Sequence, residues 1–246
     1  MIELVNAIII ITLIIIIYKY FEGQSYDIVM VKSTINGKSY LVRNLENKQE
    51  AADLLGALAL KLEKLVNLIN DSGYEVIYDK YMKPTLDKES QSEKNNKNKN
   101  TDSIEGQDGG SSETDQLAST IKMKLKEDIR RLYKNFNPEA LSETTPDAKY
   151  TSYSVNKGEK IVFCLRDKKD GEKLVKENIM TFVSIYELAH LMTKNIGHEP
   201  EFWSNFKLLL KISIDNGIYK NIDFNSTPKP YCGIQITDTP LKPNEL

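Results

Sequence analysis

Apolar residues are concentrated near the start of the chain. Residues 4–18 are nearly all Leu, Val and Ile, and Tyr18, Tyr20 and Phe21 follow as an aromatic edge. A helix of roughly 20 apolar residues can cross a bilayer, and 2–21 reaches that length if the aromatic edge lies at the membrane interface. No basic residue precedes the run and no small-residue cleavage site follows it, which argues against a signal peptide. The pattern predicts a transmembrane anchor over 1–23.

Charges around this run indicate an orientation. Glu3 precedes it, whereas Lys19 and Lys32 follow it. Because lysine and arginine are enriched on the cytosolic side of membrane proteins, the bias places the body of the protein there. We therefore expect a single-pass membrane protein that contacts the bilayer through residues 2–21.

Residues 24–86 show a strand pattern followed by a helical one. Two β-rich runs, 28–35 and 39–42, flank Asn36-Gly37, a pair that favours a tight type I′ hairpin turn. Apolar residues then recur at helical spacing over 47–70, with Asn47 as a candidate N-cap. Residues 74–82 read as a short strand. We take the apolar stripe of the helix as a packing face.

Residues 87–115 have a different composition, dominated by Ser, Asn, Lys, Glu, Asp, Gln and Gly. Such a segment buries too little apolar surface to offset the entropy lost on ordering, so we expect a disordered polar linker. Its lysines are interspersed with acidic residues and lack aromatic neighbours, and the net charge of the chain is −2. Neither feature favours nucleic-acid binding.

Residues 116–246 alternate between helical and strand patterns. We expect a helix over 116–134, strands over 149–155 and 159–166, a helix from 178 or 181 to 195, and a helix from Pro200 to 215. The tail carries one candidate edge strand at 231–236. These elements predict an α+β fold in which a small sheet packs against helices, behind the transmembrane helix.

The chain has only two cysteines and two histidines, and their positions bear on disulfide bonding and on metal binding. Cys164 and Cys232 are too few for a disulfide framework, which fits a reducing compartment or a fold that needs no bridges. The only two histidines, His190 and His198, fall within one short stretch. Such placement is unexpected for histidines that are merely scattered.

That stretch carries the candidate chemistry. In the helical run Tyr186-Glu187-Leu188-Ala189-His190, positions 186 and 190 share one face, one turn apart. This is the layout of the H-E-x-x-H motif, in which two imidazoles hold zinc and the glutamate takes a proton from water. Tyrosine replaces the first histidine here, whereas His198, after Gly197, supplies a further candidate ligand.

The run from Tyr186 to His190, with the later Gly197-His198-Glu199-Pro200-Glu201-Phe202-Trp203, resembles the H-E-L-A-H … G-H-x-x-x-F-W signature of WLM/SprT-like zinc metallopeptidases. It is more similar still to N-terminally anchored forms from nucleocytoplasmic large DNA viruses. The resemblance covers most of the chain except 87–115. It implies a zincin-like domain in which Glu187 is the catalytic base and His190 and His198 are Zn²⁺ ligands.

Tyr186 departs from that signature at the first ligand position. A phenol has a pKa of about 10, so it must lose a proton unfavourably before it binds metal as a phenolate. Two imidazoles alone make a weak site, because a catalytic zinc ion has three protein ligands. We therefore expect a membrane-anchored, metallopeptidase-like protein with impaired catalysis that acts on a protein or peptide. Two alternatives stay open: a structural or scaffolding component of a large-DNA-virus virion or its inner membrane, and a module that binds peptides without cleaving them.

Overall fold

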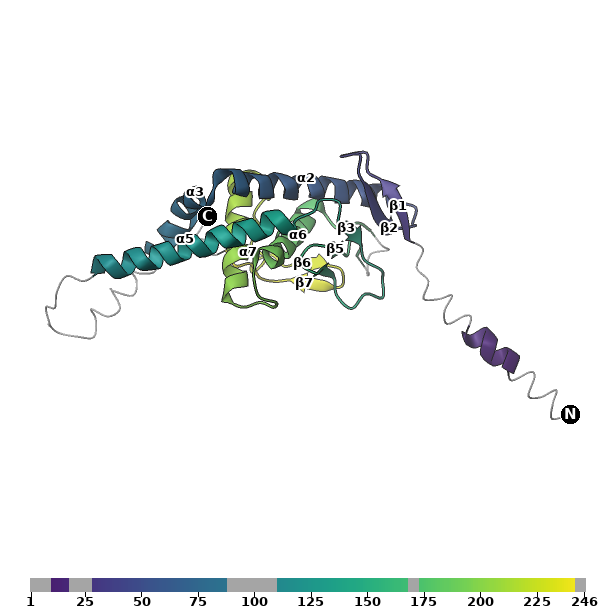
Figure 1. Cartoon of the computed structure of the whole chain (residues 1–246). Coiled ribbons are helices and arrows are strands. Elements are labelled where there is room, and N and C mark those ends of the chain that lie inside the picture. Colours follow the sequence, from purple (N-terminus) through teal and green to yellow (C-terminus); the bar gives the residue numbers. More distant parts are fainter. Residues whose placement is uncertain (1–9, 18–27, 88–109, 168–172, 242–246) are drawn as a thin grey trace.

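The computed structural model describes residues 10–17, 28–87, 110–167 and 173–241 (Figure 1). The named strands are β1 (Ile28–Lys32), β2 (Ser39–Arg43), β3 (Leu141–Glu143), β4 (Ser152–Val155), β5 (Lys160–Phe163), β6 (Lys229–Tyr231) and β7 (Ile234–Ile236). The named helices are α2 (Lys48–Ser72), α3 (Tyr74–Ile77), the π-helix η1 (Tyr78–Met82), α5 (Gly110–Asn135), α6 (Glu177–Met192) and α7 (Pro200–Asp215).

The sheet is mixed. Its strand order is β1-β2-β3-β5-β4, with β1–β2 and β4–β5 antiparallel and β2–β3 and β3–β5 parallel. Strands β6 and β7 form a separate antiparallel pair. The β2–β3 connection is a crossover that contains the long helices α2 and α5, whereas β3 and β5 are joined through residues 144–159, which include β4. The fold is therefore mixed α/β, and the expectation of an α+β fold behind a membrane helix is wrong.

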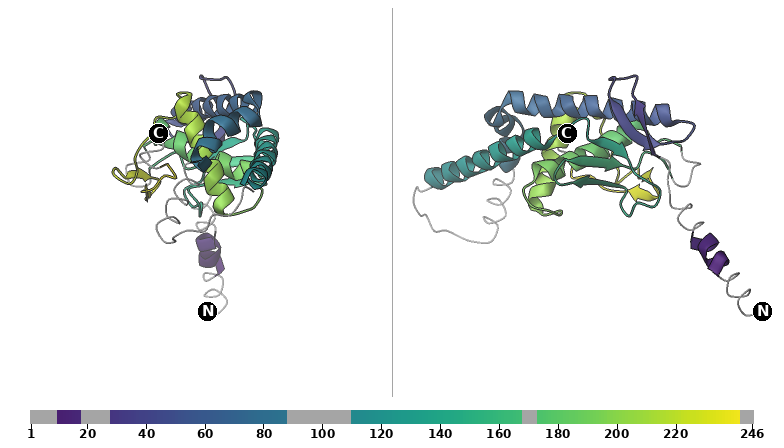
Figure 2. Two further views of the ribbon diagram at one scale, coloured as in Figure 1. Left: turned by 90° about the vertical axis from the view of Figure 1, so that its left-hand side faces the viewer. Right: turned by 45° about the vertical axis from the view of Figure 1, so that its right-hand side comes forward.

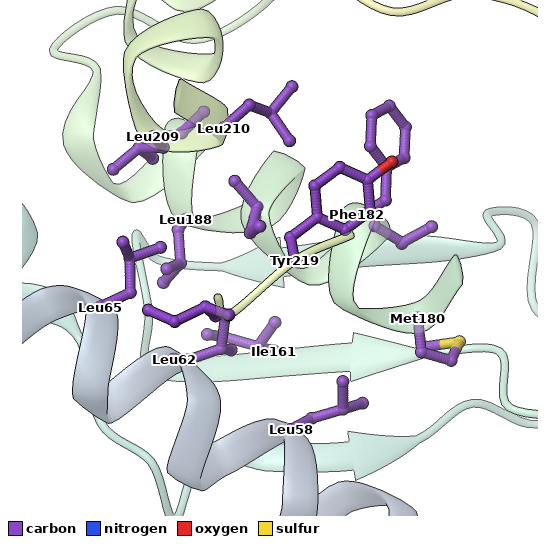
Figure 3. Close-up of a cluster of buried hydrophobic side chains, with 14 of the residues drawn as sticks. Leu58, Leu62, Leu65, Ile161, Met180, Phe182, Leu188, Leu209, Leu210 and Tyr219 are labelled. Carbon is purple, nitrogen blue, oxygen red and sulfur yellow. The ribbon is translucent and has the colours of Figure 1, made fainter. Parts of the chain in front are cut away.

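Helix α6 lies at the centre of the core. Twelve of its sixteen residues are buried, since α2, α5, α7 and the sheet all pack against it. Figure 3 shows leucines of α2 facing Ile161 of β5 and Leu188 of α6, with Leu209 and Leu210 of α7 nearby. A helix buried on nearly every side cannot move independently. Any side chain that α6 presents to a cleft is therefore held rigidly.

Helices α2 and α5 run side by side along one face of the molecule (Figures 1 and 2). Leu125, Ile129 and Leu132 form the buried side of α5. The ammonium groups of Lys122 and Lys126 lie over the rings of Tyr78 and Tyr74, 4.9 and 5.4 Å from the ring centres. These cation–π contacts join α5 to the segment that follows α2.

The transmembrane prediction is wrong. Residues 10–17 are helical, and at 1.5 Å per residue this stretch spans about 12 Å, against roughly 30 Å of hydrocarbon. Within the described ranges, no helix combines the length and apolar character that a bilayer crossing needs. The anchor over 1–23 and the single-pass localisation with a cytosolic body are overturned by this finding. The other positions of that predicted span lie outside the described residues.

Three further local predictions need correction. Residues 74–82 form α3 and the π-helix η1, not a strand. The β1–β2 connection is a six-residue loop, 33–38, rather than a two-residue turn at Asn36-Gly37, because Lys32 pairs with Ser39. This loop is held by α2, where the Asp53 carboxylate accepts hydrogen bonds from Ser33 Oγ and Thr34 N at 3.0 and 2.6 Å. Residues 110–115 of the predicted linker belong to α5, whereas 88–109 lie outside the described residues.

Candidate functional site

The C-terminal end of α6 is fixed by the turn between β4 and β5. Lys157 Nζ donates to the carbonyl oxygens of His190, Thr193 and Asn195 at 3.0, 2.8 and 3.0 Å. Lysine near a helix C-terminus satisfies carbonyls that have no partner within the helix. The turn itself needs Gly158, which has φ +111° and approaches Asn135 so closely that a Cβ would collide with its carbonyl. The β4–β5 turn of the sheet and the end of α5 therefore meet α6 at its last turn.

Three aromatic side chains with polar atoms converge beside this end. The ring centres of Tyr186 and His190 are 5.0 Å apart, those of His190 and His198 are 5.0 Å apart, and those of Tyr186 and His198 are 5.6 Å apart. The Tyr186 hydroxyl is hydrogen-bonded to His198 Nε2. Phe202 of α7 packs against both imidazoles. The structure therefore brings together both histidines and the tyrosine that the sequence singled out.

Glu187 lies beside them but points to the sheet. The residue is 2% exposed, and its Oε1 accepts a hydrogen bond from Ser152 Oγ of β4 at 2.7 Å. Its Oε2 is buried and has no hydrogen-bond partner among the described residues. Burial raises the pKa of this carboxyl to about 7. A buried carboxylate oxygen without a donor is costly, and a water molecule or a ligand would satisfy it.

Burial also sets the protonation of the ring groups. It lowers the pKa of His190 to about 4, with further lowering from His198 and Lys157. The imidazole is therefore neutral at pH 7, which is the form that binds metal. Burial, reinforced by Glu187, raises the pKa of Tyr186 to about 12, so its phenol keeps its proton. The tyrosine acts here as a neutral partner of His198.

These residues fit a zinc ion only in part. The imidazoles of His190 and His198 are ligands of the type that zinc uses, and the unpartnered Glu187 Oε2 suits a nearby water. The third position is held by a protonated phenol, which is a poor ligand at neutral pH. Across the described ranges, no cluster of three or more His, Cys, Asp or Glu side chains could hold a metal ion. The geometry provides two ligands and a base, one ligand fewer than catalytic zinc sites use.

A cleft of about 690 Å³ is lined by Tyr186 and by Ser152, the hydrogen-bond partner of Glu187. Its walls come from residues 150–152 at the start of β4, from α6 and α7, and from the segment 234–240. The buried rings of Phe182 and Phe206 form its floor, and the exposed ring of Trp203 lies at its mouth. A concave, mostly apolar cleft with a few polar groups at one end is typical of a ligand site.

The wall formed by β6 and β7 was not foreseen from the sequence. Cys164, after β5, and Cys232, in the β6–β7 turn, form a disulfide. The two cysteines were judged too few for a disulfide framework, and that reasoning did not foresee this single bridge. Tyr231, next to Cys232, is 2% exposed, and its hydroxyl donates to the Thr151 carbonyl at 3.3 Å. The segment predicted as one edge strand is a covalently anchored hairpin. The spacing of two cysteines 68 residues apart carried no signal of this pairing.

The raised pKa of Glu187 predicts a pH effect on stability in the presence of EDTA. The unfolded chain ionises this carboxyl near pH 4.5, whereas the folded chain keeps the proton until about pH 7. Stability from Glu187 is therefore complete below pH 4.5 and is lost as pH rises through 7. Between pH 6 and 8 the free energy of unfolding should fall by about 1 kcal/mol more in the wild type than in Glu187→Gln. Urea unfolding at the two pH values measures this difference.

Comparing the variant with the wild type removes the contribution of His190, which has the opposite slope between pH 4 and 6.5. Ser152→Ala is the matched control, because it removes the donor to Glu187 and keeps the carboxyl. Equal pH dependence of Glu187→Gln and the wild type would contradict the raised pKa.

Comparisons with known proteins give one relative along the whole chain. No protein-family model matches the sequence. "Uncharacterized protein R325" of Acanthamoeba polyphaga mimivirus is 31% identical over 239 residues, which are 97% of this chain and 98% of that protein. "Uncharacterized protein 136R" of Invertebrate iridescent virus 6 is 35% identical over 69 residues, 28% of this chain and 38% of that protein.

Among solved structures, Wss1 of Saccharomyces cerevisiae gives a TM-score of 0.30 at 20% identity, over 42% of this chain and 84% of that one. A TM-score this low carries no argument about the site. The mimivirus protein matches this chain along nearly its whole length at 31% sequence identity, which is enough to assign the chain to its family. The chain belongs to the family of "Uncharacterized protein R325" of Acanthamoeba polyphaga mimivirus.

Proposed function

We propose that this protein is metallopeptidase-like, with a degenerate zinc site and impaired catalysis. His190 and His198 would hold the ion, and Glu187 would act as the general base. Tyr186, in the first ligand position, would weaken both binding and hydrolysis. The observation that carries the proposal is the convergence of the His190 and His198 rings, 5.0 Å apart between their centres, on Tyr186, which lines the cleft. Glu187, the next residue of α6, adds a buried carboxylate oxygen that has no hydrogen-bond partner among the described residues.

The chain's own residues support this role in a defined way. Neutral His190 is ready to donate an electron pair, and Lys157 holds the helix end that carries it. Ser152 fixes one oxygen of Glu187 and leaves the other to receive a proton. A carboxyl with a pKa near 7 suits a general base at neutral pH. Zinc, when bound, would supply a Lewis acid that polarises the substrate carbonyl.

Zinc titration of the full chain against a chromophoric chelator tests the proposal. We expect the wild type to bind one zinc ion weakly, and His190→Ala and His198→Ala each to lower the affinity at least ~10-fold, because each removes a direct ligand. Lys194→Ala is the matched control, since this exposed side chain lies between the histidines in sequence and should leave the affinity unchanged.

Casein hydrolysis by the zinc-loaded chain completes the test. Any activity should fall by roughly 100-fold or more in Glu187→Gln, the loss expected for a general base. If the wild type binds zinc no better than the two histidine variants, the metal site is refuted. If zinc binds but Glu187→Gln retains the wild-type rate, the role of the base is refuted.

A further inference from the structure

The floor of the cleft is a preformed cluster of aromatic rings. Phe182 of α6 lies 5.2 Å from Phe206 of α7 and 4.6 Å from Phe224, measured between ring centres. Phe182 also packs against Tyr219, as Figure 3 shows. Because these rings support one another and sit in the central core, the cleft does not need to form upon binding. Preorganisation of this kind lowers the entropic cost of binding a ligand.

One wall of the cleft offers backbone hydrogen-bonding groups. Cys232 and Gly233 have φ values of +49° and +88°, so they form a two-residue turn of type I′ flanked by Tyr231 and Ile234. The flanking pair exchanges hydrogen bonds, and the next pair, Pro230 and Gln235, therefore does not. This alternation suits Pro230, which has no N–H. The N–H and C=O of Gln235 consequently point away from β6, toward the outer edge of β7.

The charged residues that line the cleft limit the class of ligand that it can bind. Asp238, at the rim, is the one charged residue among the described residues that line it. Trp203 and Ile234, 45% and 51% exposed, add apolar surface at the mouth. Such a lining favours an uncharged apolar group and disfavours an acidic one. Together with the edge of β7, it matches a polypeptide segment better than an anionic small molecule.

We propose that the cleft binds an extended polypeptide segment that pairs with the edge of β7 through Gln235 and inserts one large apolar side chain, such as Phe or Leu, among the aromatic rings. This inference rests on the proposed function, because the bound segment would be its substrate. Binding itself uses no metal ligand. Strand addition supplies hydrogen bonds that any sequence can make, and the pocket supplies the selectivity.

The test measures binding of fluorescein-labelled, end-blocked hexapeptides to the full chain by fluorescence anisotropy in the presence of EDTA. The probes are hexa-alanine and the same peptide with a single Phe or a single Asp at the third position. We expect the Phe probe to bind roughly 10–100-fold more tightly than hexa-alanine, from burial of one aromatic side chain. The Asp probe should bind no better than hexa-alanine. Equal binding of the three peptides overturns the proposal.

Substitutions in the cleft and at the edge of β7 test whether the peptide binds there. Val183 lines the cleft from α6, so Val183→Phe should fill it and remove the preference for the Phe probe. Val76→Phe is the matched control, on an exposed position of α3. Gln235→Pro removes the outward N–H and should weaken every probe, whereas Gln235→Ala keeps that N–H and should not. Binding of the Phe probe that both Val183→Phe and Gln235→Pro leave unchanged refutes this placement.

N-methylation of the peptide provides a test that leaves the protein unaltered. Methylating each backbone nitrogen of the Phe probe in turn removes one donor at a time. One methylated position should lose at least ~10-fold in affinity if the segment pairs as a strand. A series with no sensitive position argues against strand pairing.

The outcomes separate the two proposals. A preference for Phe in a chain that binds no zinc supports the cleft and refutes the metal site. Zinc binding without a preference for Phe supports the metal site and refutes the peptide-binding cleft.

Discussion

Tyr186→His should raise the zinc affinity of this protein by at least ~100-fold. The variant provides a third imidazole within a helical turn of His190, beside His198, where the wild type has a neutral phenol. Loss of a partner that only supports a ligand costs 10–100-fold in metal affinity, so gain of a direct ligand should reach at least the upper end of that range. Competition with a chromophoric chelator measures the change.

Two companion variants make the result specific. Tyr150→His places an imidazole at an exposed position of the same cleft, where the native ring contacts Tyr153, and should leave the affinity unchanged. Tyr186→Phe keeps the ring but removes the hydroxyl bonded to His198. Because a protonated phenol is not a ligand, Tyr186→Phe should bind zinc at least as well as the wild type. A clear loss of affinity in Tyr186→Phe would show that Tyr186 binds as a phenolate, contrary to our proposal.

Removing the Cys164–Cys232 disulfide should produce the largest loss of stability. The bridge closes a loop of 68 residues, and the chain-entropy model gives about 4 kcal/mol for a loop of this length. The double variant Cys164→Ser, Cys232→Ser should therefore unfold at a much lower urea concentration. Chemical denaturation followed by tryptophan fluorescence measures the free energy, with Trp203 as the reporter at the cleft.

The wild type under reducing conditions is the control for this variant, because it loses the bridge without a change of sequence. Both should lose a similar free energy of unfolding. Stability of the double variant within about 1 kcal/mol of the oxidised wild type would show that the bridge contributes little.

The helices around the site could be predicted because their signals are local. Pro200 marks the beginning of α7, and apolar spacing marked α2, α6 and the buried side of α5. The side chains of Tyr186, His190 and His198 were expected to meet because one helix and the turn that follows it bring these three positions together. No long-range information was needed for any of these features.

The errors arose where distant contacts override local preference. Residues 74–82 have a strand-like composition, yet α5 packs over them and they are helical. β3 has only three residues and is defined by its neighbours in the sheet, so it has no pattern of its own. The cysteine pair and the role of Ser152 as partner of Glu187 depend on the spatial approach of segments that are far apart in sequence.

The covalent tie between β5 and the β6–β7 hairpin also affects how the protein should be handled in the laboratory. Dithiothreitol and similar reagents, routinely added to buffers for zinc proteins, would cut this tie and release one wall of the cleft. The same thiols also compete for the metal. An assay that contains them would record a loosened, metal-depleted molecule, and its negative result would say little about the oxidised one.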